Sequence, residues 1–421
     1  MSLAVCLLCI MLVPLALAGL ALIHQGLGRS RSAAHAMLAT LCAFAVAVVA
    51  FVLIGAGLAG YPGGPMHAIF LGGVRWNVLG AGPYMGHMPA VGALFPELVL
   101  ALQIFAAGIA VVIPVSAGND RWRLMAICAA SAVFAGVLYP LFAHCVWGGG
   151  WLTQMTASFG LPNFVDAGGA GVVQVMGGLA ALSVAWVIGP RQGKYSDRMA
   201  TAIPGHNIVL VLFGCVLALT GWVGLDVAGS LLYFGAAPEQ LVMTIINAVL
   251  CASAGCLAAV VTTRVRYRKA DASLSANGWV AGLVAGSAAC GTVQPAAAII
   301  IGIVAGTLVT FVVESLELKL MVDDPGGAIA VHGVAGIWGL LACGLFSATA
   351  SRGGLLLTQL IGIATLLGVM LPLIHLCNVL LNLVVPYRVD ADGDWQGMDI
   401  RELGAGAYPE FVMHAEEFVP R

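Results

Sequence analysis

The stretches "DAGGAGVVQ" (Asp166–Gln174) and "DPGGAIAVH" (Asp324–His332) write one pattern twice in the same chain. Each opens on an Asp, carries Gly-Gly-Ala and a Val at the same places, and ends in a polar residue eight positions after the Asp. The copies lie 158 residues apart and end in different residues, Gln174 and His332. The repeat indicates an internal duplication, and the changed last residue indicates a change in chemistry.

The composition predicts an integral membrane protein. The chain has 421 residues, of which 61% are hydrophobic and 9% are charged, whereas a typical soluble domain is about 25% charged. The long apolar runs lack the alternation of a membrane barrel, so the spans are expected to be helices. A net charge of −2 and the lack of a basic run give no indication of nucleic acid as a partner.

A span needs about 20 apolar residues, and the sequence predicts eleven transmembrane helices. Their expected positions are 3–25, 36–59, 93–115, 124–143, 164–189, 207–225, 241–262, 275–292, 294–313, 328–348 and 354–384. Residues 1–384 would form the membrane domain, and residues 385–421 a C-terminal tail.

The repeated stretches open the fifth and tenth predicted spans, which therefore run in opposite directions. The expected fold is an all-α membrane protein of two inverted five-helix repeats plus an eleventh helix. Inverted repeats are typical of transporters, whose sites lie near the bilayer midplane between the repeats. Gln174 and His332 are therefore expected to meet at the centre, within reach of a hydrogen bond in which the Gln amide donates to the imidazole.

The basic residues predict the orientation in the membrane. With the N-terminus outside, 15 of the 17 Lys and Arg residues fall on the cytoplasmic side, and only Arg75 and Arg352 fall outside. This asymmetry follows the positive-inside rule. It predicts a cytoplasmic C-terminus and a multi-pass protein of the plasma (inner) membrane.

Few polar side chains fall inside the predicted spans, where they are costly and usually face a cavity or a partner helix. Asp166 starts the fifth span, where a structural role as a cap on the N–H groups of Gly168 or Gly169 is expected. Asp226 follows the end of the sixth span. The repeat favours a functional role for His332 over a simple bond to a neighbouring helix.

The segment "AHCVWGGGW" (143–151) places Trp147 at the outer end of the fourth span. Taken alone, it is best explained as an interfacial aromatic anchor. The functional alternative is a cation–π platform at a pore mouth.

These residues, taken together, resemble the ammonium transporter family (Amt/Mep/Rh). The resemblance runs from "GLALIHQGLGR" (19–29) to "GMDIRELGAGAYPE" (397–410), with "AHCVWGGG", "GWVGLDVAGS", "NGWVAGLVAG" and "DDPGGAIAVHGVAGIWG" in the family's order. It implies a homotrimer of eleven-helix subunits, each with a narrow hydrophobic pore. It also implies a cytoplasmic tail that docks a PII-type regulator.

The resemblance assigns roles residue by residue. Trp147 would be the aromatic platform of the outer site and Ser230 its hydroxyl. Asp166 would be the structural carboxylate near the entrance, and His332 the second pore histidine. Ammonium would lose its proton outside, because a bare cation is too costly in a dry pore, and ammonia would pass.

The chain also departs from the family pattern. Gln174 stands where the first pore histidine is expected, and the two gating phenylalanines fall at Ala106, with Phe105 beside it, and at Leu225. Gln is not titratable, so a two-histidine proton relay is unavailable. The tail reads "LGAGAY" (403–408) where the family carries His-Gly-Glu.

Three functions remain open from the sequence. The first is a transporter or channel for ammonium or ammonia with a modified pore. The second is an ammonium receptor that conducts little, and the third is a channel for another small neutral solute, which the smaller gate residues favour. No nucleophile–base pair, metal cluster or phosphate loop supports an enzyme, and no cofactor is expected.

Overall fold

The computed structural model describes residues 3–82, 92–197, 199–348 and 351–408. Its helices are α1 (Leu3–Leu12), α2 (Pro14–Leu27), α3 (Ala33–Ala50), α4 (Ala56–Ala59), α5 (Leu94–Ala117), α6 (Leu124–Val133), α7 (Tyr139–Val146), α8 (Met155–Phe159), α9 (Met176–Ile188), α10 (Ile208–Phe234), α11 (Pro238–Tyr267), α12 (Ala272–Ser287), α13 (Pro295–Leu318), α14 (Ala335–Phe346), α15 (Arg352–Thr365), α16 (Leu371–Val384) and α17 (Ala391–Gln396). Short 3-10 and π segments are η1 (Ser30–Ser32), η2 (Phe51–Gly55), η3 (Phe134–Leu138), η4 (Trp151–Gln154), η5 (Ala170–Val175), η6 (Ile329–Val334), η7 (Leu366–Met370) and η8 (Asp399–Leu403). The strands are β1 (Met66–Leu71), β2 (Val74–Gly80), β3 (Tyr195–Ser196) and β4 (Met199–Ala200).

When consecutive α, 3-10 and π segments are counted as one continuous helix, their number agrees with the predicted number of spans. Within the described residues, ten helical rods are long and apolar enough to cross a membrane. The remaining predicted span, 275–292, corresponds to α12, which has 16 residues and a mostly buried surface. It packs between α11, α13 and α14, so the fold class is confirmed.

One predicted boundary is wrong in a way that matters. The sixth span was expected to end at residue 225, but α10 continues to Phe234. Asp226 therefore lies two turns inside a membrane helix, where it is 1% exposed. The sequence misleads here because a carboxylate in an apolar run normally marks a helix end.

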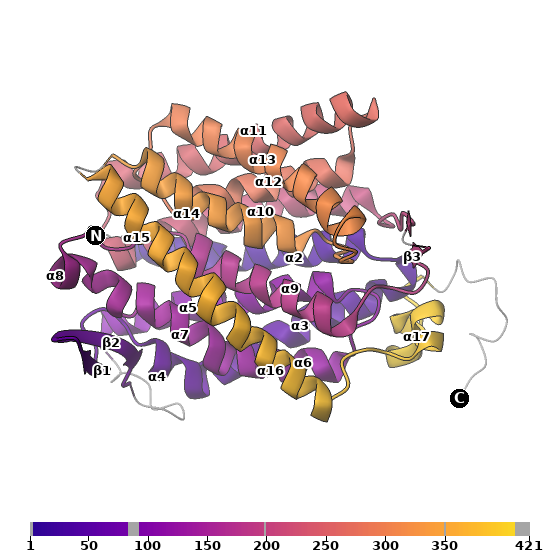
Figure 1. Cartoon of the computed structure of the whole chain (residues 1–421), viewed down its shortest axis with the longest axis horizontal. Helices are drawn as coiled ribbons and strands as arrows, with labels where there is room; N and C mark the ends of the chain where they lie inside the picture. The colour runs from indigo at the N-terminus through magenta and orange to yellow at the C-terminus, as the bar shows by residue number, and fades with distance from the viewer. Residues whose placement is uncertain (1–2, 83–91, 198, 349–350, 409–421) are drawn as a thin grey trace.

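The helices run roughly side by side along the long axis of the molecule (Figure 1). The hairpin of β1 and β2 and the short helix α8 lie at one end, and β3 and α17 lie at the other. The chain begins at the end that holds α8, whereas the described tail lies at the opposite end (Figure 1). This placement agrees with an odd number of crossings.

The repeated stretches form the same local structure in both copies. Each leads into a π segment, η5 or η6, which continues as a regular α-helix. The second glycine of each Gly-Gly has a positive φ, 83° at Gly169 and 71° at Gly327. Glycine adopts this conformation without a steric penalty, which explains why both copies keep it.

The Asp of each stretch caps its own helix. The Asp166 Oδ2 atom accepts hydrogen bonds from the N–H groups of Gly171 and Val172, each at 2.9 Å. Asp324 Oδ2 accepts from Ile329 N–H at 2.7 Å. The predicted cap at Asp166 is confirmed, with Gly171 and Val172 as its donors, whereas Gly168 N–H donates to the carbonyl of Ser287.

A cluster of buried ion pairs holds together the end of the molecule that carries α17. Arg191 pairs with Asp323 and with Asp120, each at 2.9 Å. Burial tends to raise the pKa of Asp323, but the charges of Arg121 and Arg191 outweigh it and hold that pKa well below its usual range. The tail joins this cluster through Asp394, which pairs with Arg29 at 2.9 Å.

Candidate functional site

Gln174 and His332 meet where the two repeats cross. The imidazole Nδ1 of His332 lies 2.8 Å from Oε1 of Gln174, and the residues are 2% and 0% exposed. The expected contact is confirmed. Its direction differs from the expectation, because the amide oxygen faces the ring, so Nδ1–H donates and Nε2 keeps its lone pair.

The crossing is close because small residues lie beside the pair. A Cβ added to Gly178, one turn after Gln174, would overlap the backbone of Gly333. The Nε2 group of Gln174 has no hydrogen-bond partner within the described residues. A buried donor without a partner is costly, so this amide is available to a polar solute.

An aromatic ring covers the imidazole from a third helix. Trp222 of α10 stacks on His332, with ring centroids 6.3 Å apart and planes 26° apart. The sequence comparison placed the gate of this helix at Leu225, which is fully buried. Trp222, three residues before Leu225, is the aromatic side chain of α10 that packs on the histidine.

At the other end of η5, Trp147 is not an open platform. It is 1% exposed and stacks on Tyr233 of α10, with centroids 4.6 Å apart and planes 7° apart. Its indole N–H donates to the carbonyl of Asp166 at 2.8 Å. A cation could reach the covered face of Trp147 only after Tyr233 moves. No pattern in the sequence indicates the role of Tyr233, because the pairing depends on how α10 is rotated.

Ser230 lies on the same stretch of α10, three residues before Tyr233. Its hydroxyl is buried and lies 3.7 Å from the thiol of Cys290. Its neighbour Gly229 packs so closely on the carbonyl of Ala167 that a Cβ there would overlap it. Trp147 and Ser230 thus both border the segment that leads into η5.

The two candidate residues on α5, Phe105 and Ala106, have different surroundings. Ala106 is fully buried, whereas Phe105 is partly buried and stacks on Phe44 of α3, with centroids 6.3 Å apart. Phe105 is therefore engaged with α3. Its ring therefore does not take the place of the gating phenylalanine that the family resemblance assigns to the position of Ala106.

A second histidine lies near the pair and was missed. His24 of α2 is 2% exposed, and its Nδ1 atom has no partner within the described residues. The two imidazoles lie close enough to interact electrostatically. The stretch "GLALIHQGLGR" contains it, but nothing in a single sequence shows which side of α2 it occupies.

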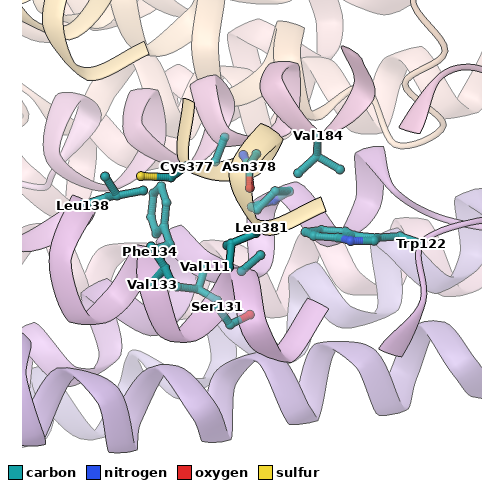
Figure 2. Close-up of a pocket in the computed structure, with 13 residues that line it drawn as sticks. Val111, Trp122, Ser131, Val133, Phe134, Leu138, Val184, Cys377, Asn378 and Leu381 are labelled. Atoms are coloured by element: carbon teal, nitrogen blue, oxygen red, sulfur yellow. The ribbon is translucent and has the colours of Figure 1, made fainter. Parts of the chain in front are cut away.

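The pocket in Figure 2 lies away from these residues. It is a cavity of about 20 Å³ between α5, α6, η3, α9 and α16, with room for about one water molecule. Its polar Asn378 is satisfied by the hydroxyls of Ser183 and Tyr387, each at 2.9 Å. A larger cavity of about 120 Å³ lies at the end that carries α17, beside Asp324 and Gly327.

Two helices of opposite direction that cross at a buried polar pair define a membrane transport protein of the inverted-repeat class. The chain belongs to the Ammonium Transporter Family, whose sequence model matches residues 4–408. It is 35% identical over 432 aligned residues to the "Ammonium transporter Amt2" of Archaeoglobus fulgidus, covering 96% of this chain and 88% of that protein. It is 30% identical to the "Ammonium transporter" of Bacillus subtilis, covering 96% and 97%.

Solved structures show the same fold. The structure titled "Sensor Amt Protein" matches with a TM-score of 0.86 and 25% identity, covering 95% of this chain and 97% of that one. Candida albicans Mep2 matches with a TM-score of 0.78 and 23% identity, covering 98% and 92%. The family resemblance drawn from the motifs is confirmed.

Proposed function

We propose that this protein passes ammonium nitrogen across a membrane as neutral ammonia, through a pore centred on Gln174 and His332. The observation that carries the proposal is the buried 2.8 Å contact between these side chains in a member of the Ammonium Transporter Family. An isolated cation is costly in a low-dielectric channel. A neutral solute with one lone pair and three N–H bonds suits a line of two polar side chains.

In this proposal ammonium is first held at the outer site near Trp147 and Ser230, with Asp166 ordering the entrance. It returns one proton to outside water, and the N–H electron pair stays on nitrogen. Ammonia then donates a hydrogen bond to the free lone pair on Nε2 of His332 and accepts one from the unpaired amide N–H of Gln174. Because Gln174 cannot titrate, the pair does not relay the proton.

A second candidate is an ammonium sensor that binds and conducts little. It is favoured by the similarity to the "Sensor Amt Protein" and by the stacked Trp147 and Tyr233, which close the outer face. A channel for another small neutral solute is the third, supported by the small residue Ala106 and the aliphatic Leu225 at the expected gates.

We also propose the orientation and assembly of the protein. The basic residues favour an N-terminus outside and a cytoplasmic tail in the plasma (inner) membrane. The family resemblance supports a homotrimer. The tail is the surface at which a PII-type regulator would dock, although residues 403–408 depart from the family's His-Gly-Glu motif.

Ammonia flux into proteoliposomes tests the proposal. With a pH dye inside, an ammonium pulse should alkalinise the lumen faster in vesicles that contain the protein than in empty vesicles. His332→Ala should lose the selectivity for ammonium over methylammonium. Saturable ammonium binding with no added flux would overturn conduction and support the sensor.

A further inference from the structure

Asp226 is a buried carboxylate to which the pore described above gives no role. It is 1% exposed, and neither carboxylate oxygen makes a hydrogen bond within the described residues. The nearest hydroxyl, that of Ser287, donates to the carbonyl of Leu283 at 3.0 Å. It lies well inside α10, two turns before the helix ends at Phe234. The ion pairs of the described chain do not include it, and the buried ones cluster around Arg191 at the far end.

The position of Asp226 along α10 places it between the outer site and the crossing. Trp222, Asp226 and Ser230 are spaced four residues apart and therefore share one face of the helix. Trp222 stacks on His332, and Ser230 borders the outer site. Each step along the axis is about 6 Å at 1.5 Å per residue, so Asp226 lies about halfway between them.

The same carboxylate touches the first repeated stretch. Oδ1 of Asp226 occupies the space that a Cβ on Gly168 would take. Gly168 therefore leaves room for the carboxylate at the entrance to η5. Within the part of the chain that the structure describes, the titratable groups that interact with Asp226 are Asp166, Cys251 and Cys290, and none of them is a cation.

A lone carboxylate in a membrane interior is costly unless a cation or a proton neutralises it. Functional ionisable residues of membrane helices usually face the path of an ion. Ammonium is a small cation whose N–H groups can donate to both free oxygens of Asp226.

We propose that Asp226 is an ammonium-binding residue. Its carboxylate lies at the inner side of the outer site and holds the cation there before ammonia enters the Gln174–His332 crossing. This inference rests on the proposed function and adds a binding group to it.

The first test compares Asp226→Asn with wild type in the proteoliposome flux assay. The neutral, isosteric variant should raise the half-saturating ammonium concentration at least tenfold. The matched control is Glu239→Gln, which removes an exposed carboxylate from the first turn of α11 and should leave half-saturation unchanged. Normal half-saturation in a folded Asp226→Asn protein would overturn the inference while leaving the proposed function intact.

A second test uses the wild-type protein, so it holds even where the variant fails to fold. A hydrophobic carbodiimide labels protonated buried carboxyl groups, and peptide mass spectrometry reports the labelling of Asp226. Ammonium chloride should slow that labelling at least threefold relative to the same concentration of sodium chloride. Equal labelling in both salts would overturn the inference, and a wild type with neither flux nor protection would overturn the proposed function as well.

Discussion

Replacing Gln174 by His tests whether the amide is what stops the proton. The structure predicts that the fold tolerates the change, because an imidazole can also accept the hydrogen bond that His332 Nδ1–H makes to Oε1 at 2.8 Å. The cost in free energy of unfolding should stay within the value of one net hydrogen bond, about 0.5–1.5 kcal/mol. Gln174→Leu, the control, leaves the Nδ1–H group buried without an acceptor and should cost about 1–3 kcal/mol.

The functional effect should be larger than the effect on stability. A positioned proton-transfer group typically contributes about 10²–10⁴-fold, so even a poorly aligned second imidazole should raise the ammonium-driven current about tenfold. The assay is a current recording on proteoliposomes under ammonium pulses, with thermal unfolding in detergent as the check on the fold. An unchanged current in a folded Gln174→His protein would mean that Gln174 already does the work of the histidine, and the reasoning would be wrong.

Three further predictions address the outer site, the repeat and the ion cluster. Trp147→Ala should raise the half-saturating ammonium concentration about fivefold, equivalent to about 1 kcal/mol of cation–π energy, and unchanged uptake would count against that site. Gly169→Ala should destabilise the protein by about 1–3 kcal/mol because of its φ of 83° and the nearby Trp147 ring, whereas the control Gly368→Ala has open space and should not lower the melting temperature. Asp323→Asn should cost about 3–5 kcal/mol, because it removes the charge partner of Arg121 and one of the two charge partners of Arg191. Because the folded-state pKa of Asp323 is depressed, its contribution should be full above about pH 4 and fade as the pH falls further. A melting temperature that is flat from pH 5 downward would contradict the role given to this ion pair.

The repeated stretch allowed the centre of the molecule to be predicted from sequence. Because Asp and Gly-Gly recur at the same places, both copies adopt the same capped turn with a left-handed second glycine, and the residues eight positions on are brought together. This inference needs only local geometry and a two-fold relation. It succeeds for Gln174 and His332 without any knowledge of the surrounding helices.

The remaining features depend on how each helix is rotated, which one sequence does not show. Tyr233 covers Trp147, and Trp222 packs on His332, because α10 turns those side chains toward η5 and η6. The sequence predicts a helix end at Asp226, because charged residues are rare inside membrane helices, yet the apolar residues after it continue α10 to Phe234. The pairing of Arg191 with Asp323 joins two loops far apart in sequence, and no local pattern indicates such a contact.

The number of charges moved per ammonia tests the central claim most directly. Ammonia entry, measured by the lumenal pH dye, and charge, measured by the current, can be recorded on the same wild-type proteoliposomes. With Gln174 in place we expect rapid ammonia entry with close to zero charge per molecule. One charge for every ammonia would show that the proton crosses with it and would contradict the broken relay.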